Sequence, residues 1–333
     1  MRTRILLAIC CLLTASLSAR GSALAGLREV GIIPLPNVEG RIDHMAYDAK
    51  SGRLYAAALG NDTVEVVDVA QGKVIHVIRG LHEPQGIGIA AAAHRIMVAN
   101  GKDGSCRIFD DRSFQQVGLV DLKDDADNIR YDAASRRFCV GYGDGGLACI
   151  DPETGKQLAD VKLDGHPESF QLEARGRRIF VNVPTAHQVA VIDRDRLRIV
   201  AKWPVKGAAA NFPMALDETD HRLFIGCRSP ARLLVLDTQT GKLLASAPIV
   251  GDTDDLFYDL KHKCIYVSGG EGKITIVRQE TTDRYAVAGE LTTIPGARTS
   301  FFVPDAGTLY LAVPHRGTQR AELRVFKTEP PGP

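Results

Sequence analysis

The chain has 333 residues, with 41 Lys and Arg against 40 Asp and Glu. This near-zero net charge excludes a protein that binds nucleic acid through a general positive field. A hydrophobic content of 45% and a charged content of 24% are ordinary for a soluble globular protein, and 32 Gly with 16 Pro indicate many turns.

The first residues have the pattern of a cleavable secretory signal. Residues 1–4 carry two arginines, residues 5–13 are apolar, and an Ala-x-Ala sequence ends at Ala25. The apolar run is too short for a transmembrane helix, which needs about 20 residues. We therefore expect residues 1–25 to be removed, and the mature protein to reside in the periplasm or outside the cell without a membrane span.

Short strands separated by turns follow from residue 27 onward. Residues 27–33 form an isolated predicted strand, and the first complete set of four strands, A to D, covers residues 44–47, 54–58, 64–67 and 74–78. No stretch has apolar residues at helical spacing, which excludes helical repeats. The sequence therefore predicts an all-β protein.

The same pattern of strands recurs along the whole chain. A three-residue step that ends in an aromatic or apolar residue marks the start of each strand B. The last residues of successive steps are 42, 42, 41, 44, 42 and 44 positions apart: Tyr55, Met97, Cys139, Phe180, Phe224, Tyr266 and Tyr310. In five of the seven repeats the next strand ends in Asp. A period of this length, with four short strands in each unit, is typical of β-propeller blades.

The turns between strands C and D have a defined chemistry. Asp151-Pro-Glu-Thr-Gly-Lys and Asp237-Thr-Gln-Thr-Gly-Lys place Asp at the start of the turn and Gly near its end. Asp can accept hydrogen bonds from the turn backbone, and Gly tolerates a positive φ. We interpret these aspartates as turn formers rather than catalysts.

The repeats predict one domain, residues 26–328, built as a seven-bladed propeller of four-stranded antiparallel blades. The last repeat lacks its outer strand, and residues 27–33 can supply it, so the N-terminal strand closes the ring in the C-terminal blade. Residues 329–333 are expected to form a short disordered tail, and we expect a monomer. Five cysteines remain after signal removal, and we interpret them as small buried hydrophobic residues: Cys106, Cys139, Cys149, Cys227 and Cys264.

The Arg-Leu-Tyr step, the Val-x-Val-Ile-Asp strand, the Asp-x-x-Thr-Gly-Lys turn and residues 296–299 (Gly-Ala-Arg-Thr) resemble the YVTN (YncE-like) family of exported bacterial seven-bladed propellers. The resemblance covers the whole mature chain and implies a binding or interaction protein. WD40 repeats do not fit, because Trp203 is the only Trp. Quinoprotein propellers share the turn, but the Trp that follows it in their repeat is absent, so we expect no pyrroloquinoline quinone.

The loops that lead into the seven strands A should meet at one end of the central channel. These loops hold nine carboxylates against two arginines, a local charge near −7, together with three histidines. The candidate ligand-binding residues are Arg41, Asp43, His44, His82, Glu83, Asp127, Asn128, His166, Glu168, Asp254, Asp255 and Arg298. The pattern predicts an acidic mouth that attracts a small cation, a metal ion or a basic segment of a partner protein.

Several functions remain open at this mouth. A divalent metal ion would have suitable oxygen and imidazole ligands in His44, Asp127, His166 and Glu168. These residues do not show the short sequence spacing that would identify a particular set of metal ligands. We expect a binding protein with no assigned catalytic residue, and no nucleic acid at an acidic mouth. The alternative is a propeller enzyme, a lyase, lactonase or metal-dependent hydrolase, that acts on the same face.

Overall fold

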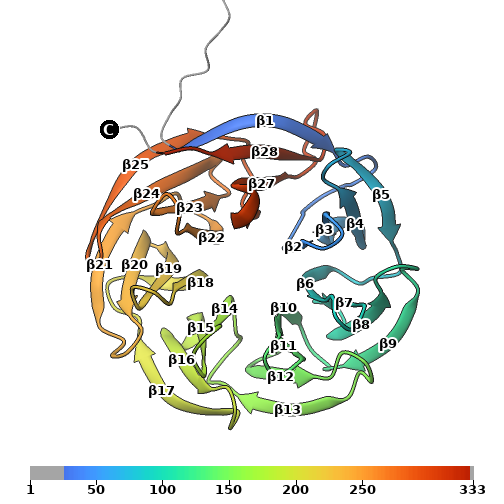
Figure 1. Ribbon diagram of the computed structural model, residues 1–333, viewed down its shortest axis with the longest axis horizontal. Helices are drawn as coiled ribbons and strands as arrows, with labels where there is room; N and C mark the ends of the chain where they lie inside the picture. The colour runs from blue at the N-terminus through green and yellow to red at the C-terminus, as the bar shows by residue number, and fades with distance from the viewer. Residues whose placement is uncertain (1–25, 331–333) are drawn as a thin grey trace, which may run out of the picture.

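The computed structural model describes residues 26–330, which form a ring of seven four-stranded antiparallel sheets (Figure 1). The predicted all-β, seven-bladed propeller is confirmed. The proposed signal, residues 1–25, and the last residues of the tail, 331–333, lie outside the described residues. Within residues 26–330 no helix has the length and apolar character needed to cross a membrane.

Each blade runs outward from the central channel in chain order. The first blade contains β2 (Met45–Asp48), β3 (Arg53–Ala58), β4 (Thr63–Asp68) and β5 (Lys73–Ile78). The second contains β6 (Pro84–Ala90), β7 (Arg95–Asn100), β8 (Ser105–Asp110) and β9 (Gln116–Asp121). The third contains β10 (Ala126–Asp132), β11 (Arg137–Tyr142), β12 (Gly146–Ile150) and β13 (Gln157–Lys162).

The remaining blades repeat this order. The fourth contains β14 (Phe170–Leu172), β15 (Arg178–Val183), β16 (Gln188–Asp193) and β17 (Arg198–Pro204). The fifth contains β18 (Ala209–Asp217), β19 (Arg222–Ser229), β20 (Ala231–Asp237) and β21 (Leu243–Pro248). The sixth contains β22 (Thr253–Asp259), β23 (Cys264–Gly269), β24 (Lys273–Thr281) and β25 (Arg284–Thr292). In the described part of the chain, short 3₁₀ turns lie at Leu59–Asn61, Pro184–Ala186 and Pro304–Ala306.

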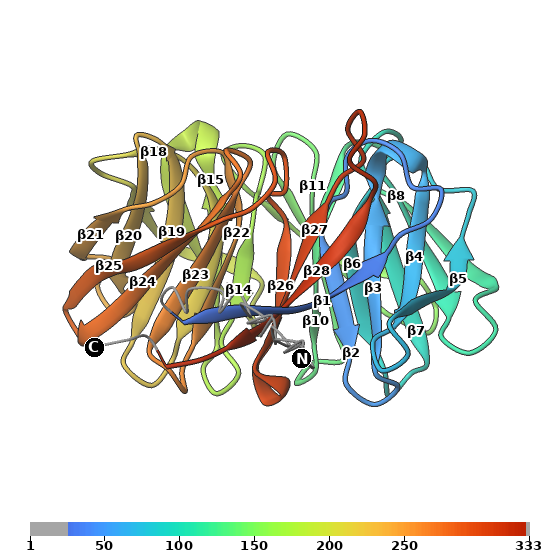
Figure 2. The same cartoon turned by 90° about the horizontal axis from the view of Figure 1, so that it is seen from above.

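The seventh blade joins the two ends of the described chain. Its inner strands are β26 (Ser300–Val303), β27 (Thr308–Val313) and β28 (Glu322–Thr328), and its outer strand is β1 (Leu27–Pro34). β1 pairs antiparallel with β28, with Leu27 opposite Thr328 and Pro34 opposite Glu322, and Figure 2 shows β1 lying against β28 at the rim. The predicted closure by the N-terminal strand is therefore confirmed.

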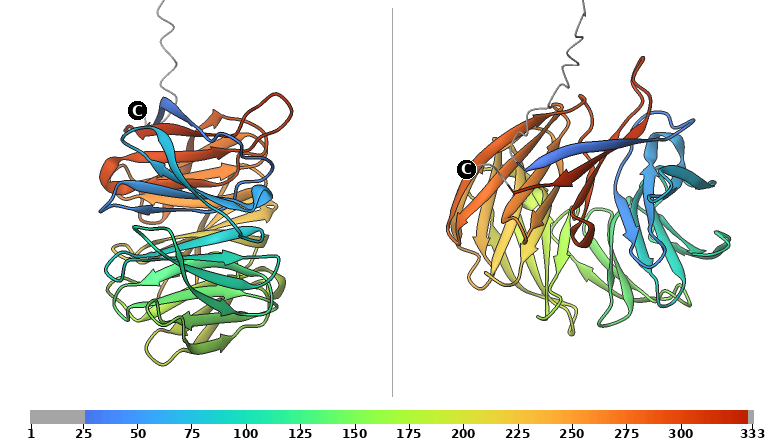
Figure 3. Two further views of the ribbon diagram at one scale, coloured as in Figure 1. Left: turned by 90° about the vertical axis from the view of Figure 1, so that its right-hand side faces the viewer. Right: turned by 45° about the horizontal axis from the view of Figure 1, so that its top comes forward.

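The hydrophobic core lies between blades rather than in one central mass. Each buried cluster combines side chains of two neighbouring sheets; Tyr55 of the first blade and Ile96 of the second belong to the same cluster. The views in Figure 3 show the sheets side by side around the ring, with their loops on the two faces of the disc. The five cysteines are buried free thiols in this core, and Cys139 lies opposite Cys149 in the pairing of β11 with β12.

The arginine that begins strand B connects neighbouring blades. The Arg53 guanidinium donates to the Asp111 carbonyl at 3.0 Å, and that of Arg137 donates to the Arg194 carbonyl at 2.6 Å. Both acceptors belong to the turn between strands C and D of the next blade. Arg53 and Arg137 therefore have a structural role, which is to connect successive blades.

Candidate functional site

The mouth of the channel forms where the inner strands begin. Register shifts occur at this end of four of them, between Pro84 and Ile87 in β6, and at matching places in β10, β18 and β22. Such β-bulges bend a strand and change the direction of its side chains. Carboxylates at the start of β10 and β22 can therefore turn toward the side chains that precede β2.

Asp43 and His44 come from the loop that leads into β2. The Asp43 carboxylate is 1% exposed, and its Oδ2 accepts a hydrogen bond from Arg41 Nη2 at 2.9 Å. Its second oxygen, Oδ1, is buried and accepts no hydrogen bond from any described residue. Burial raises the pKa of Asp43 to about 6, although the charges of His44 and Arg41 oppose the rise.

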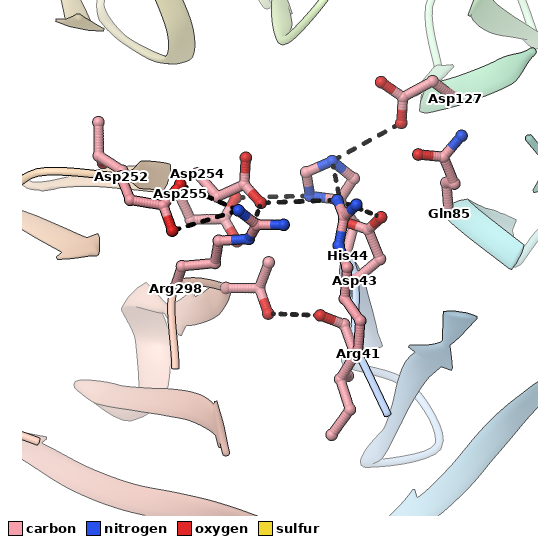
Figure 4. A network of polar contacts seen from close by, with 12 residues as sticks. Arg41, Asp43, His44, Gln85, Asp127, Asp252, Asp254, Asp255 and Arg298 are labelled. Carbon is pink, nitrogen blue, oxygen red and sulfur yellow. Dashed lines mark hydrogen bonds and ion pairs between the residues drawn. The ribbon is translucent and has the colours of Figure 1, made fainter. Parts of the chain in front are cut away.

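His44 lies among three carboxylates at the centre of the mouth (Figure 4). Its Nε2 is 3.8 Å from Asp43 Oδ1 and 3.8 Å from Asp127 Oδ1, and its Nδ1 is 3.7 Å from Asp255 Oδ1. Burial alone would lower the pKa of the imidazole, but these carboxylates outweigh it and raise the pKa to about 10. His44 is therefore an imidazolium at neutral pH.

Asp127 connects His44 to a second histidine. Its other oxygen, Oδ2, is 3.8 Å from His166 Nε2, while His166 Nδ1 is 2.7 Å from the Gly143 carbonyl and donates to it. Burial opposes the charge on His166, but Asp127 and the Gly143 carbonyl raise its pKa to about 9. Burial, reinforced by the charge of Asp127, raises the pKa of nearby Glu168 to about 8.

A glycine of the neighbouring blade allows Asp127 to take this position. A Cβ on Gly86 of β6 would lie 2.0 Å from the Asp127 carbonyl oxygen. No side chain fits at that distance, so glycine lets β6 and β10 approach closely at the mouth. This glycine therefore packs two blades together directly at the site.

The other side of the mouth is rich in arginine. Asp254 Oδ2 is 3.1 Å from Arg298 Nε, and Asp254 Oδ1 accepts a hydrogen bond from Arg228. The Arg228 guanidinium also lies 3.6 Å from the centre of the Phe212 ring. Arg298 also donates to Asp252 at 2.9 Å. Arg228 and the protonated histidines, which the count from the loops leaves out, make the mouth less negative than that count.

The structure brings most predicted site residues together and leaves two apart. Arg41, Asp43, His44, Asp127, Asn128, His166, Glu168, Asp254, Asp255 and Arg298 share contacts or mutual electrostatic effects. His82 instead pairs with Asp103 at 2.5 Å, and Glu83 lies 3.9 Å from Lys102. All four of these residues belong to the second blade or the loop that precedes it, and their side chains are at least one third exposed.

Sequence reasoning missed Arg228 because it considered only the loops before strand A. Arg228 stands near the end of β19, and the register places this end beside the start of β18. In an antiparallel blade the end of strand B always lies next to the start of strand A. Reading both positions would have found Arg228.

Comparisons with known proteins fit this architecture. Residues 102–323 match the family model described as outer membrane protein assembly factor BamB. The chain belongs to this family. It also matches an uncharacterized YncE protein of Salmonella typhimurium, with 22% identity over 193 residues. That match covers 56% of the chain and 54% of the relative, so the alignment spans about half of each protein. The resemblance to YncE-like propellers is thereby confirmed.

Solved structures extend the likeness of this BamB-family chain at the level of fold. A chain of hydrazine synthase from Kuenenia stuttgartiensis aligns with a TM-score of 0.69 and 15% identity, covering 83% of this chain and 94% of that one. A chain of the mitotic checkpoint complex aligns with a TM-score of 0.73 and 13% identity, covering 98% and 99%. Such different proteins share the propeller alone, so function has to be argued from the site.

Proposed function

We propose that the protein is a propeller binding protein that takes a small organic cation, a primary ammonium group, at the mouth of the channel. The observation that supports this proposal is a pair of buried acceptors, Asp43 Oδ1 and Asp127 Oδ1, that accept no hydrogen bond from the described residues. The Asp43 and Asp127 side chains are 1% and 7% exposed. Burying carboxylate oxygens without donors is costly, so this arrangement favours a ligand that supplies them.

An ammonium group matches the geometry around His44. Asp43 Oδ1 and Asp127 Oδ1 each lie 3.8 Å from His44 Nε2, which is too far for a hydrogen bond to the imidazole. An ammonium nitrogen has three N–H donors and one positive charge, so it can donate to both oxygens at once. His44 then no longer needs its own proton to balance these carboxylates, and binding is accompanied by proton release.

The other ligands considered for the mouth fit less well. Among residues 26–330, no group of three or more His, Cys, Asp or Glu side chains is arranged to hold a metal ion. The surrounding carboxylates raise the pKa of His44 to about 10 and that of His166 to about 9, so a metal ion would have to displace a proton from each imidazole. Pyrroloquinoline quinone, itself a polycarboxylate, is repelled by Asp43 and Asp127, so we assign it no role.

The proposed setting is outside the cytoplasm. Its support is the pattern of residues 1–25, with two arginines, an apolar run and a small-residue cleavage motif. The propeller also offers two loop-bearing faces on a rigid ring, a surface suited to recognition. We include a basic segment of a partner protein among the ligands, because a lysine side chain carries the same ammonium group.

The test is calorimetric titration of the purified protein with 2-phenylethylamine at pH 8.5. The variants Asp43→Asn and Asp127→Asn keep the shape of each side chain and remove the charge. Each should weaken binding at least about tenfold, since a charge-assisted hydrogen bond contributes about 1.5–3 kcal/mol. Asp144→Asn, at an exposed loop carboxylate, is the matched control and should leave binding unchanged.

Two results would overturn the proposal. Equal binding by all three variants would show that the amine does not use the mouth. A stoichiometric metal in protein purified without chelator, lost in Asp127→Asn, would show that the carboxylates are metal ligands.

A second function has one observation in its favour. Asp43 and Glu168 both titrate near neutrality, with pKa values of about 6 and 8, and such groups suit general acid and base roles. A lyase or lactonase acting at the mouth is the corresponding enzyme. Turnover of a panel of lactones and esters, abolished by Glu168→Gln, would establish it, and absence of turnover would favour binding alone.

A further inference from the structure

The channel changes character below the mouth. A cavity of about 410 Å³ runs along it, and His44, Asp255 and Ser300 line the end nearest the mouth. The rest of the wall is mainly apolar and aromatic, with Gln171 and Arg130 as its partly exposed polar side chains. Its partly exposed apolar and aromatic side chains are Tyr47, Ile89, Tyr131, Leu216, Phe257, Tyr258 and Phe301. The volume is within the range of cavities that bind small molecules, and walls of this kind suit an apolar body.

Arg130 projects from β10 into the same cavity. Its Nη1 donates to the backbone carbonyl of Ile129 at 2.9 Å, and the guanidinium carbon lies 5.5 Å from the centre of the Phe170 ring. Within residues 26–330 it forms no ion pair at 4.0 Å or less. Burial lowers the pKa of Arg130, while the charges of Asp255 and Asp127 act in the opposite direction.

The arginines of the mouth are in a different situation. Arg41 and Arg298 each have a carboxylate oxygen within 3.1 Å, and Arg228 donates to Asp254. A guanidinium carries five N–H donors in a fork that matches a carboxylate, and the described residues use one of them on Arg130. Arg130 is therefore a partly desolvated cation with donors available to a ligand in the cavity.

We propose that the ligand is a zwitterion, an apolar amino acid whose ammonium group binds Asp43 and Asp127 while its carboxylate binds Arg130. This inference rests on the proposed function at the mouth and specifies its ligand. The cavity has a cation with unused donors and an aromatic wall, and His44 at its upper end lies 3.8 Å from the two buried acceptors of the mouth. With a zwitterion, each of these three features meets a complementary group. A simple amine satisfies the acceptors and the aromatic wall and leaves Arg130 without an anion.

The experiment compares three molecules that share one phenyl group. The purified protein is titrated at pH 8.5 with L-phenylalanine, 2-phenylethylamine, which lacks the carboxylate, and 3-phenylpropionate, which lacks the ammonium group. We expect L-phenylalanine to bind at least about tenfold more tightly than the amine, as one charge-assisted carboxylate contact predicts. Binding of 3-phenylpropionate should be weakest, because the carboxylates of the mouth repel it.

Variants of Arg130 separate this inference from the proposed function. Arg130→Gln should remove the advantage of L-phenylalanine over 2-phenylethylamine and leave amine binding within about threefold of the unaltered protein. Arg130→Lys keeps the charge and should retain part of the advantage. Arg112→Gln, at an exposed arginine on an outer turn, is the control for loss of a positive charge. Circular dichroism and the melting temperature verify that each variant folds.

The outcomes are distinguishable. Equal affinity for L-phenylalanine and 2-phenylethylamine would overturn the zwitterion inference and leave cation binding intact. The same conclusion would follow if Arg130→Gln kept the preference for L-phenylalanine. Binding of 3-phenylpropionate alone, or of none of the three, would overturn both proposals.

Discussion

The aspartates of the outer turns and those of the mouth have the same side chain in opposite environments. Asp151 begins a turn between strands C and D, and its Oδ1 accepts hydrogen bonds from the Thr154 backbone at 2.7 Å and the Thr154 hydroxyl at 2.8 Å. These bonds lower its pKa. Asp43 and Asp255 are enclosed at the mouth, and burial raises the pKa of both. The turn carboxylate is held by donors of its own turn, whereas Asp43 Oδ1 and Asp127 Oδ1 at the mouth are buried without a donor among the described residues, which supports the proposed ligand there.

The largest expected effect comes from Gly86, the glycine that packs against Asp127 at the mouth. Gly86→Ala places a methyl group against the Asp127 carbonyl, so β6 and β10 must move apart. We expect a loss of about 1–3 kcal/mol in the free energy of unfolding and loss of amine binding, measured by chemical denaturation and titration. Gly31→Ala is the control, because nothing lies within 4 Å of its added Cβ. A Gly86→Ala variant as stable as Gly31→Ala would mean that the close approach is not required.

The next effect is the pH dependence of amine binding. Cation binding competes with protons on Asp43, Glu168, His166 and His44, whose pKa values are about 6, 8, 9 and 10. Affinity should therefore rise with pH, by up to about tenfold per pH unit wherever one proton is displaced on binding. Titration in buffers of different ionisation enthalpy measures the protons released. An affinity that is flat, or falls, over this range would rule out the mouth as the binding site.

A smaller effect concerns stability. The folded-state pKa of Glu168 is raised above its unfolded value, so the folded protein binds the extra proton and stability falls as pH rises from about 4.5 to about 8. Glu168→Gln imitates the protonated acid and should flatten this decline. The expected gain over the unaltered protein is on the order of 1 kcal/mol at pH 8.5. Urea unfolding at pH 5 and pH 8.5 measures the free energy of unfolding of both proteins. An equal decline between these pH values in the two proteins would contradict a raised pKa of Glu168.

The smallest effect belongs to the outer turns. Asp151→Ala removes the acceptor of the turn that follows β12 and should cost about 1 kcal/mol of stability without changing amine affinity. Glu153→Ala, an exposed change in the same turn, should be neutral. If Asp151→Ala weakened amine binding, the separation between turn carboxylates and mouth carboxylates would be wrong.

The sequence predicted the fold well because the fold is repetitive. The alternation of apolar and polar residues, the turn residues and the spacing of marker residues such as Tyr55 and Tyr266 all indicate local structure. In a ring of seven similar blades, this local structure determines most of the fold. Even the closure was predictable, since the last repeat lacks one strand and the residues before the first repeat supply one.

The site was only partly predictable because it depends on distances between blades. The sequence places Asp43 and Asp127 in equivalent loops, but it does not reveal that Gly86 brings β10 close or that Arg228 faces Asp254. His82 occupies an equivalent loop and still pairs outside the group. Arg130 was missed for another reason: a charge within a predicted inner strand belongs to no loop, and only the channel shows where it points.

The seam between β1 and β28 has a consequence for synthesis. β1 is made before all other described strands, yet its partner is completed only at Thr328. Until then the hydrogen-bonding edges of β1 and of the incomplete seventh blade are exposed, and the nascent ring is open. A chaperone that binds unpaired strand edges would act at this stage. A circular permutant that starts at the loop before β2 and joins residue 330 to residue 26 would make the four strands of the seventh blade contiguous in sequence, removing that delay while leaving the channel unaltered.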